Sequence, residues 1–150
     1  MKKFLLLFSI LIFFMTPIAD AKVRSAKLAV DIPPGKNKVV RLKNLPQNAM
    51  VKVEAKSNGT VNIFFIDQKN YEKYPNIKRP LFQSQIIDSL SFTLNIPSFG
   101  HYYIVFNNAS RTRPVKVDVI IHGASGNDAI LMKNILPGEH NKDSRLRTIT

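Results

Sequence analysis

Short apolar runs alternate with turn residues along most of the chain after residue 21. Within several runs the apolar residues occupy every second position, as Val51, Val53 and Ala55 do between Lys52, Glu54 and Lys56. A period of two is typical of a β-strand with one buried face. The pattern predicts about seven strands, over residues 28–32, 40–42, 51–55, 61–67, 91–96, 101–107 and 115–121.

These strands predict an all-β fold, an antiparallel β-sandwich. A sheet with one apolar face needs a covering layer, and the helical candidates are too short to supply one, so two sheets packed face to face are the simplest solution. The run from Val61 to Ile66 has only Asn62 as a polar residue, which indicates a central strand covered on both faces. Ser57-Asn58-Gly59 predicts a hairpin turn that leads into this strand.

A long connection separates the strands at 61–67 and 91–96. Asp67 is expected to cap a short helix that runs through Tyr74 and is ended by Pro75. Residues 76–88 are then a loop or an edge strand. Two roles remain open for the connection 68–88: a binding loop, or a crossover whose large side chains cover the core, namely Tyr71, Tyr74, Leu81 and Phe82.

The first 21 residues predict a secretory signal peptide. Lys2 and Lys3 precede an apolar run from Phe4 to Met15, and Ala19-Asp20-Ala21 supplies small residues for cleavage before Lys22. A helix of this run would be about 18 Å long, against a hydrocarbon core of about 30 Å, which argues against a membrane anchor. The short Lys-Lys start is typical of bacteria, so we expect export to the periplasm or beyond the cell.

The remaining chain divides into two parts. Residues 22–123 form the predicted sandwich, and residues 124–150 are expected to form a short helix, over Asp128 to Leu136, followed by a polar tail. Packing of this helix against the sandwich and a partner-binding tail are the two alternatives for its role.

The amino-acid composition excludes several kinds of site and gives the chain a large positive charge. The chain contains no cysteine, which excludes disulfide scaffolds, thiolate zinc sites, iron–sulfur clusters and thiol nucleophiles. Its formal net charge is +12, and it stays at +11 when Lys2, Lys3 and Asp20 are removed with the signal peptide. Such an excess of positive charge attracts anionic partners.

Four segments together resemble a GOLD-type β-sandwich. They are the strand 61–67, the Asn70-Tyr71 and Tyr74 positions, the strand 92–97 and the run 100–108, which contains Gly100-His101-Tyr102-Tyr103 and ends in Asn107-Asn108. The resemblance covers roughly residues 61–122. It implies a non-catalytic module for protein or lipid recognition, and it transfers no catalytic residue.

A search for catalytic or metal-binding motifs finds none. His101, His122 and His140 lack the spacing of a zinc site, and no nucleophilic serine motif is present. We therefore expect no catalytic residue, no metal and no cofactor. A hydrolase of a cell-envelope polymer remains an alternative, because paired carboxylates can cleave glycosides. The acidic candidates are Asp31, Glu54, Asp67, Glu72, Asp88 and Asp118.

Arginines in predicted loops are the best candidates for an anion-binding site. Arg111 and Arg113 follow the strand 101–107, and their guanidinium groups suit phosphate or sulfate oxygens better than an ammonium group does. Lys78 and Arg79 form a second candidate pair. Membrane insertion beside these cations would need exposed aromatic side chains, for which the candidates are Tyr71, Tyr74 and Phe99.

The leading hypothesis is a secreted, non-enzymatic protein that binds an anionic surface. The ligand would be a phosphoinositide or other anionic lipid, or a sulfated or phosphorylated polymer such as a polyanionic glycan, and the protein could then act as a host-directed effector. Nucleic acid is disfavoured, because interleaved stacking aromatics are missing. The alternative is a periplasmic or extracellular module that binds a host or envelope protein through the 68–88 loop.

Overall fold

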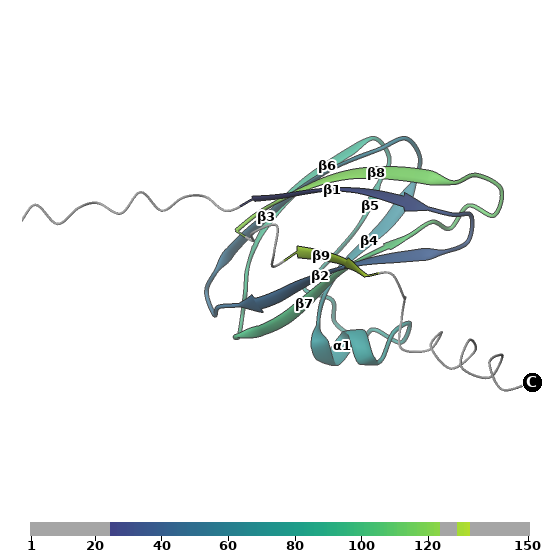
Figure 1. Ribbon diagram of the computed structural model, residues 1–150. Coiled ribbons are helices and arrows are strands. Elements are labelled where there is room, and N and C mark those ends of the chain that lie inside the picture. Colours follow the sequence, from purple (N-terminus) through teal and green to yellow (C-terminus); the bar gives the residue numbers. More distant parts are fainter. Residues whose placement is uncertain (1–24, 124–128, 133–150) are drawn as a thin grey trace, which may run out of the picture.

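The computed structural model describes residues 25–123 and 129–132, which form two antiparallel β-sheets packed face to face with one short helix (Figure 1). The elements in chain order are β1 (Ser25–Ile32), β2 (Asn37–Leu45), β3 (Met50–Ser57), β4 (Val61–Asp67), α1 (Gln68–Glu72), β5 (Phe82–Ile86), β6 (Ser89–Asn95), β7 (Gly100–Asn107), β8 (Val115–His122) and β9 (Ala129–Met132). The predicted β-sandwich is therefore confirmed. Within the described residues, no helix is long and apolar enough to cross a membrane.

The strand order is that of a jelly roll. One sheet has four strands in the order β1-β8-β3-β6, and the other has five in the order β5-β4-β7-β2-β9. Consecutive strands pass from one sheet to the other at every described connection except that from β4 to β5. Two sheets whose strands alternate along the chain in this way define the jelly-roll architecture.

This topology brings four connections to one end of the sandwich. Asn107, the last residue of β7, pairs with Asn37 and Asn62 at the starts of β2 and β4, while Ile32 pairs with Val115 in the other sheet. We call this end the arginine tip. It comprises the connections 33–36, 58–60, 87–88 and 108–114. The connections 46–49, 68–81 and 96–99 leave their strands at the opposite end.

The main core lies between the two sheets. The inward residues of the strands alternate with exposed ones, so that β3 contributes Val51, Val53 and Ala55, all buried, as the period of two predicted. Phe65 and Tyr102 fill the centre from the five-stranded sheet, with ring centroids 5.9 Å apart. This core fixes the positions from which the connections at both ends project.

A second apolar cluster lies on the outer face of the five-stranded sheet, beneath α1. Its buried members are Val39, Ile66, Tyr71, Tyr103 and Val105. The rings of Tyr71 and Tyr103 stack with centroids 3.9 Å apart, which attaches the helix to β7. Asp67 caps this helix as predicted, since its Oδ1 accepts the Asn70 N–H at 2.8 Å. Strand β4 lies between β5 and β7 and is covered on both faces, so its predicted central position is confirmed.

Three expectations from the sequence need correction. The turn at Ser57-Asn58-Gly59 does not close a hairpin, because β3 and β4 belong to different sheets. Residues 82–86 of the long connection form the edge strand β5, one of the two alternatives predicted for residues 76–88, which raises the strand count above seven.

The third correction concerns the predicted helix over residues 128–136. Ala129–Met132 instead forms β9, which pairs with β2 from Leu42↔Ala129 to Val39↔Met132, so the sheet continues beyond Gly123. A short apolar run is too short to show whether its period is that of a helix or of a strand. Here the backbone groups at the edge of β2 form hydrogen bonds with residues 129–132, which favours the strand. The predicted signal peptide, the polar tail and His140 lie outside the described residues.

Candidate functional site

The loop that carries Arg111 and Arg113 is fixed by Asn108. This side chain is fully buried, and its Nδ2 donates to the carbonyl oxygens of Ile32, Pro33 and Arg113 at 3.1, 3.3 and 2.8 Å. Its Oδ1 accepts the Ser110 N–H at 3.0 Å. A single amide therefore ties the loop to the end of β1 and closes the loop on itself.

Ser110 adds further bonds within the arginine tip. Its Oγ accepts the Arg113 N–H at 3.2 Å, and its carbonyl oxygen accepts the Gly35 N–H at 2.7 Å. Gly35 has φ of 64°, a conformation that glycine adopts without strain. The loops 33–36 and 108–114 consequently form one hydrogen-bonded unit whose geometry exists before any ligand arrives.

Both arginines at this tip are exposed, and neither joins an ion pair with another described residue. Lys36 and Lys116 are also exposed on the same end, the first in the 33–36 loop and the second on β8. Two carboxylates lie at the same end: Asp31, opposite Lys116 in the ladder, and the exposed Asp88 in the 87–88 connection. The tip therefore presents free guanidinium groups with an excess of positive charge.

A shallow hollow of about 310 Å³ opens beside this loop. Its walls include three prolines, Pro33, Pro34 and Pro114, together with the polar residues Asn58, Lys116 and Asp31. The Asn58 Oδ1 accepts the Lys116 N–H at 2.9 Å, which fixes one wall. Apolar ring surface next to exposed cations suits a partner that has both apolar and acidic groups.

Lys78 and Arg79 are attached to the other end of the sandwich. The Arg79 carbonyl oxygen accepts from Asn70 Nδ2 at 3.2 Å, and the Leu81 N–H donates to Phe65 at 2.9 Å. The ladder from Asp67↔Tyr102 to Asn62↔Asn107 separates this end from the arginine tip by about 17 Å. Both side chains are exposed, but no described contact joins them to Arg111 or Arg113.

The three candidate interfacial aromatics occupy different environments. Tyr71 is 7% exposed and stacks on Tyr103, so it packs α1 onto the sheet and does not offer a free ring. Tyr74 is half-buried, with its hydroxyl 3.4 Å from Asn37 Oδ1 and from Asn107 Nδ2. Phe99 is 69% exposed, but it lies in the 96–99 connection at the end opposite the arginines.

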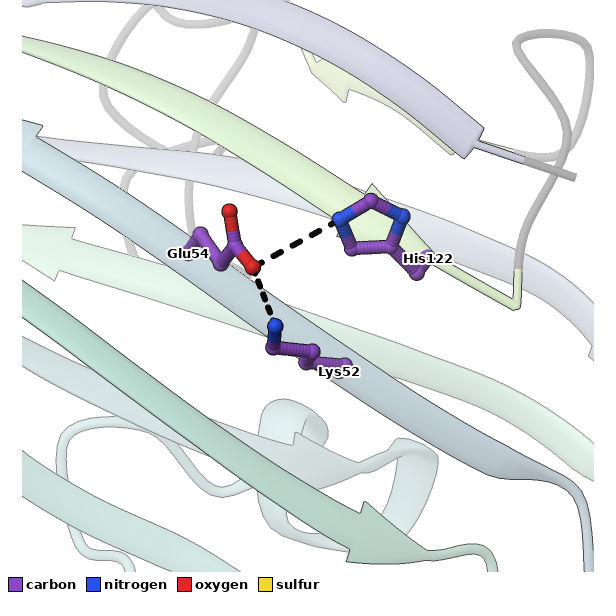
Figure 2. Close-up of polar contacts among 3 residues, drawn as sticks. All are labelled: Lys52, Glu54 and His122. Atoms are coloured by element: carbon purple, nitrogen blue, oxygen red, sulfur yellow. Dashed lines mark ion pairs between the residues drawn. The ribbon is translucent and has the colours of Figure 1, made fainter. Parts of the chain in front are cut away.

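The outer face of the four-stranded sheet carries the ion pairs of the described residues. Glu54 on β3 pairs with Lys52, and its Oε1 lies 3.8 Å from His122 Nε2 on β8 (Figure 2). The hydrogen bond and the charge of Lys52 lower the pKa of Glu54 below its ordinary value. Glu54 is therefore an anion at neutral pH, whereas a general acid needs a raised pKa.

The remaining acidic and histidine candidates have structural or exposed positions. Asp67 caps α1, and Glu72 accepts from Gln68 Nε2 at 2.8 Å. His101 Nδ1 accepts the Asn44 N–H at 3.2 Å. Among residues 25–123 and 129–132, no group of three histidine or acidic side chains is placed to hold a metal ion.

Sequence reasoning missed two features of the tip: the role of Asn108 and the hollow beside it. Asn108 follows the strand 101–107 and precedes Ala109-Ser110, which is the pattern of a side chain that bonds to the backbone two residues later. Two of its three carbonyl partners, Ile32 and Pro33, lie at the end of β1, more than seventy positions earlier in the chain. The sequence therefore indicated the turn but not the burial of the amide.

Comparison with known proteins gives a fold and no family. No family model matches the chain, and no curated protein matches it significantly. Among solved structures, PliG of Aeromonas hydrophila, a periplasmic inhibitor of g-type lysozyme, is 14% identical and covers 67% of this chain and 86% of its own, with a TM-score of 0.51. The Yersinia pseudotuberculosis-derived mitogen is 8% identical, covers 76% and 98%, and has a TM-score of 0.48.

The likeness to PliG shows that the two chains share a β-rich fold. The GOLD-type resemblance stays a prediction, because none of these comparisons tests it.

Proposed function

We propose that this protein is an exported, non-enzymatic binding protein that recognises an acidic surface of another protein through Arg111 and Arg113. The observation that carries the proposal is the fixed loop 108–114, in which the buried Asn108 amide holds the backbone that presents both arginines. A preformed loop loses little conformational freedom on binding. Guanidinium groups form paired hydrogen bonds with carboxylates, and arginine is enriched among the residues that dominate protein interfaces.

A membrane is a weaker candidate partner for this tip. Each basic residue near an anionic bilayer contributes about 1 kcal/mol, so the four exposed cations of this tip together contribute about 4 kcal/mol, which corresponds only to about millimolar affinity. Insertion of an aromatic side chain would strengthen binding, but Phe99 lies at the opposite end, Tyr71 is buried and Tyr74 is half-buried. The large exposed apolar side chain at this tip is that of Ile87, which is aliphatic. The proline-lined hollow offers an apolar contact that a polyanionic glycan would leave unused.

The structural likeness to PliG is consistent with this proposal. That protein is a periplasmic inhibitor, so a similar fold serves protein binding outside the cytoplasm there. For the present chain, export rests on the predicted signal peptide, and the non-enzymatic role rests on the sequence, in which no nucleophilic serine motif and no zinc-site spacing were found. A host protein and an envelope protein are both compatible with the site.

The segment 68–88 is less suited to be the binding element than the arginine tip. Its helix is stacked on β7, Leu81 and Phe82 pack against the main core, and residues 82–86 complete a sheet. Deleting residues 76–85 would remove most of β5. Substitution of the exposed Lys78 and Arg79 is therefore the informative way to test this segment.

The test compares two double charge reversals on the exported protein. Wild type, Arg111→Glu/Arg113→Glu and Lys78→Glu/Arg79→Glu are immobilised and exposed separately to envelope proteins, phosphatidylserine vesicles and heparin at ~0.15 M salt. We expect the wild type and the Lys78/Arg79 variant to retain the same envelope protein. We expect the Arg111/Arg113 variant to bind it at least about tenfold more weakly.

The two variants carry the same change of charge, so a general loss of electrostatic attraction would weaken both equally and would contradict the site. Vesicle or heparin binding that persists at this salt concentration and depends on Arg111 and Arg113 would replace the protein partner by a lipid or a glycan. Near-identical circular dichroism spectra would show that each variant is folded.

A further inference from the structure

Strand β6 forms an unprotected edge of the four-stranded sheet. Its sequence, Ser-Leu-Ser-Phe-Thr-Leu-Asn, contains no charged residue and no proline, and it pairs with β3 without a register shift from Lys56↔Ser89 to Met50↔Asn95. Proteins usually protect an edge strand with charges, proline or a bulge. The other edge of this sheet, β1, carries Lys27 and Asp31.

The backbone groups on the free side of β6 can be assigned from its known hydrogen bonds. The Asp88 carbonyl oxygen accepts from Ser57, and the Ile96 N–H donates to Ala49, so the even-numbered positions face β3. Successive residues of a strand alternate in direction, so Ser89, Ser91, Thr93 and Asn95 direct their N–H and C=O groups to the open edge. All four side chains are exposed.

The strand is complementary to a second copy of itself. Antiparallel pairing about Phe92 places Ser89 opposite Asn95, Leu90 opposite Leu94, and Ser91 opposite Thr93. Polar residues then meet polar residues on the outer face, and apolar residues meet apolar residues on the inner face. The Ser91–Thr93 and Ser89–Asn95 pairs fall at the outward-directed positions, where each pair exchanges two backbone hydrogen bonds.

The apolar side of β6 would gain burial from this pairing. Leu90, Phe92 and Leu94 are only partly buried, although they pack against the main core. The Phe92 ring is stacked on Phe82, with centroids 3.8 Å apart, so it is already held in place at the centre of the contact between the two β6 strands. Strands β5 and β9 are also uncharged edges of the five-stranded sheet. β9 has only four residues, and in β5 Ile86 is fully buried and Ser84 occupies the centre, so β5 has less apolar surface to bury.

The absence of charge on β6 also favours contact between identical chains along this strand. A chain with a formal net charge of +12 repels its own copies, so association requires an uncharged strip. The nearest charged strands, β3 in each copy, would lie three strand spacings apart, about 14 Å, which exceeds the screening length of about 8 Å at physiological salt.

We infer that the protein forms a two-fold symmetric dimer in which the β6 strands of two copies pair antiparallel about Phe92 and join the four-stranded sheets into one continuous sheet. A second copy of this chain is therefore the partner that this edge accepts. The inference rests on β6 alone and is independent of the function proposed for the arginine tip.

The test measures the mass of the exported protein in solution at several concentrations. Sedimentation equilibrium of the wild type should show a monomer–dimer equilibrium. Ser91→Lys places a lysine from each copy near the two-fold axis, where the pair repel each other, and should raise the dimer dissociation constant at least about tenfold. In the monomer the new lysine faces Glu54 across the ladder, so folding is preserved.

The matched control is Gln83→Lys, which adds the same charge at an exposed position of β5, an uncharged edge of the five-stranded sheet, and should leave the dimer intact. A mixture of the Ser91→Lys and Thr93→Glu variants should form heterodimers, because residue 91 of one copy faces residue 93 of the other. A wild type that stays monomeric, larger open assemblies, or weakening by Gln83→Lys but not by Ser91→Lys would overturn the inference.

Discussion

At the scale of single residues, Asn108 links the stability of the fold to the geometry of the candidate site. Its amide bonds to Ile32 at the end of β1, to Pro33 directly after it, and to Arg113 in the loop that bears the arginines. An aspartate of the same shape would place a carboxylate against three carbonyl oxygens, so no other side chain reproduces these contacts.

Replacing Asn108 by alanine should lower the free energy of unfolding by about 1–3 kcal/mol, because one buried and two partly buried carbonyl oxygens lose their donor. Urea denaturation of wild type and variant measures this difference. Asn76→Ala, at an exposed position in the same protein, serves as the control and should change stability by less than about 0.5 kcal/mol. Equal stability of all three proteins would show that the Asn108 amide is not a structural link.

The arginines themselves show what a sequence can reveal about a site. Their position in a loop after the strand 101–107 was predictable, because Asn107-Asn108 interrupts an apolar run. Their separation from Lys78 and Arg79 was not predictable, since it depends on which connections share an end of the sandwich. Burial of Tyr71 was one of the two roles left open for residues 68–88. The sequence could not decide between them, because the stacking partner Tyr103 lies on β7, more than thirty positions along the chain.

At the scale of elements, the docking of α1 should make the protein sensitive to alkaline pH. Burial raises the pKa of both Tyr71 and Tyr103, and the charge of Arg41 lowers it by a smaller amount in each case. A raised pKa in the folded state means that folding favours the neutral phenol. The resulting stability is present below the unfolded value of 10.0 and is lost as pH rises through the folded values.

Replacing Tyr103 by phenylalanine tests this coupling. The variant should lose less stability than the wild type between about pH 8 and about pH 11, because one of the two phenols can no longer ionise. At neutral pH it should be about 0.5–1.5 kcal/mol less stable, since Tyr103 no longer donates to Gln68 Oε1. Urea titrations at the two pH values give both quantities, and an unchanged pH dependence would contradict the role of this ring.

Strands were predicted correctly where apolar and polar residues alternate along the run. The predictions failed where the structure of a segment depends on the strand with which it pairs. β3 and β8 alternate buried and exposed residues along their length, so local pattern was sufficient for them. Residues 129–132 are apolar without alternation, and the edge of β2 determines that they form β9. The turn after β3 has hairpin chemistry, yet the next strand belongs to the other sheet, because the jelly roll pairs β3 with β6 and β8.

At the scale of the whole molecule, the jelly-roll order predicts slow folding. The pairs β1–β8, β3–β6 and β2–β7 join strands that are far apart in the sequence, and β4–β5 is the one described pair that is consecutive in the chain. Chains dominated by such distant pairings fold in milliseconds to seconds, against microseconds for many helical bundles.

Refolding from urea measures this rate directly. The chain has no tryptophan and four tyrosines, so tyrosine fluorescence and far-ultraviolet circular dichroism are the suitable signals. We expect both to report the same relaxation, within about a millisecond to a few seconds, because closing the sheets requires β8 to return beside β1. Complete recovery within microseconds would show that local structure, not topology, limits folding.

The pairing of Ser25 with His122 places the start of β1 at the end of the sandwich remote from loop 108–114. A fusion partner, fluorescent dye or bead attached upstream of Ser25 would therefore leave Arg111 and Arg113 pointing outward. An array of molecules tethered in this orientation would display its cationic loops to the surrounding medium, which makes amino-terminal attachment the natural choice for capture experiments with this protein.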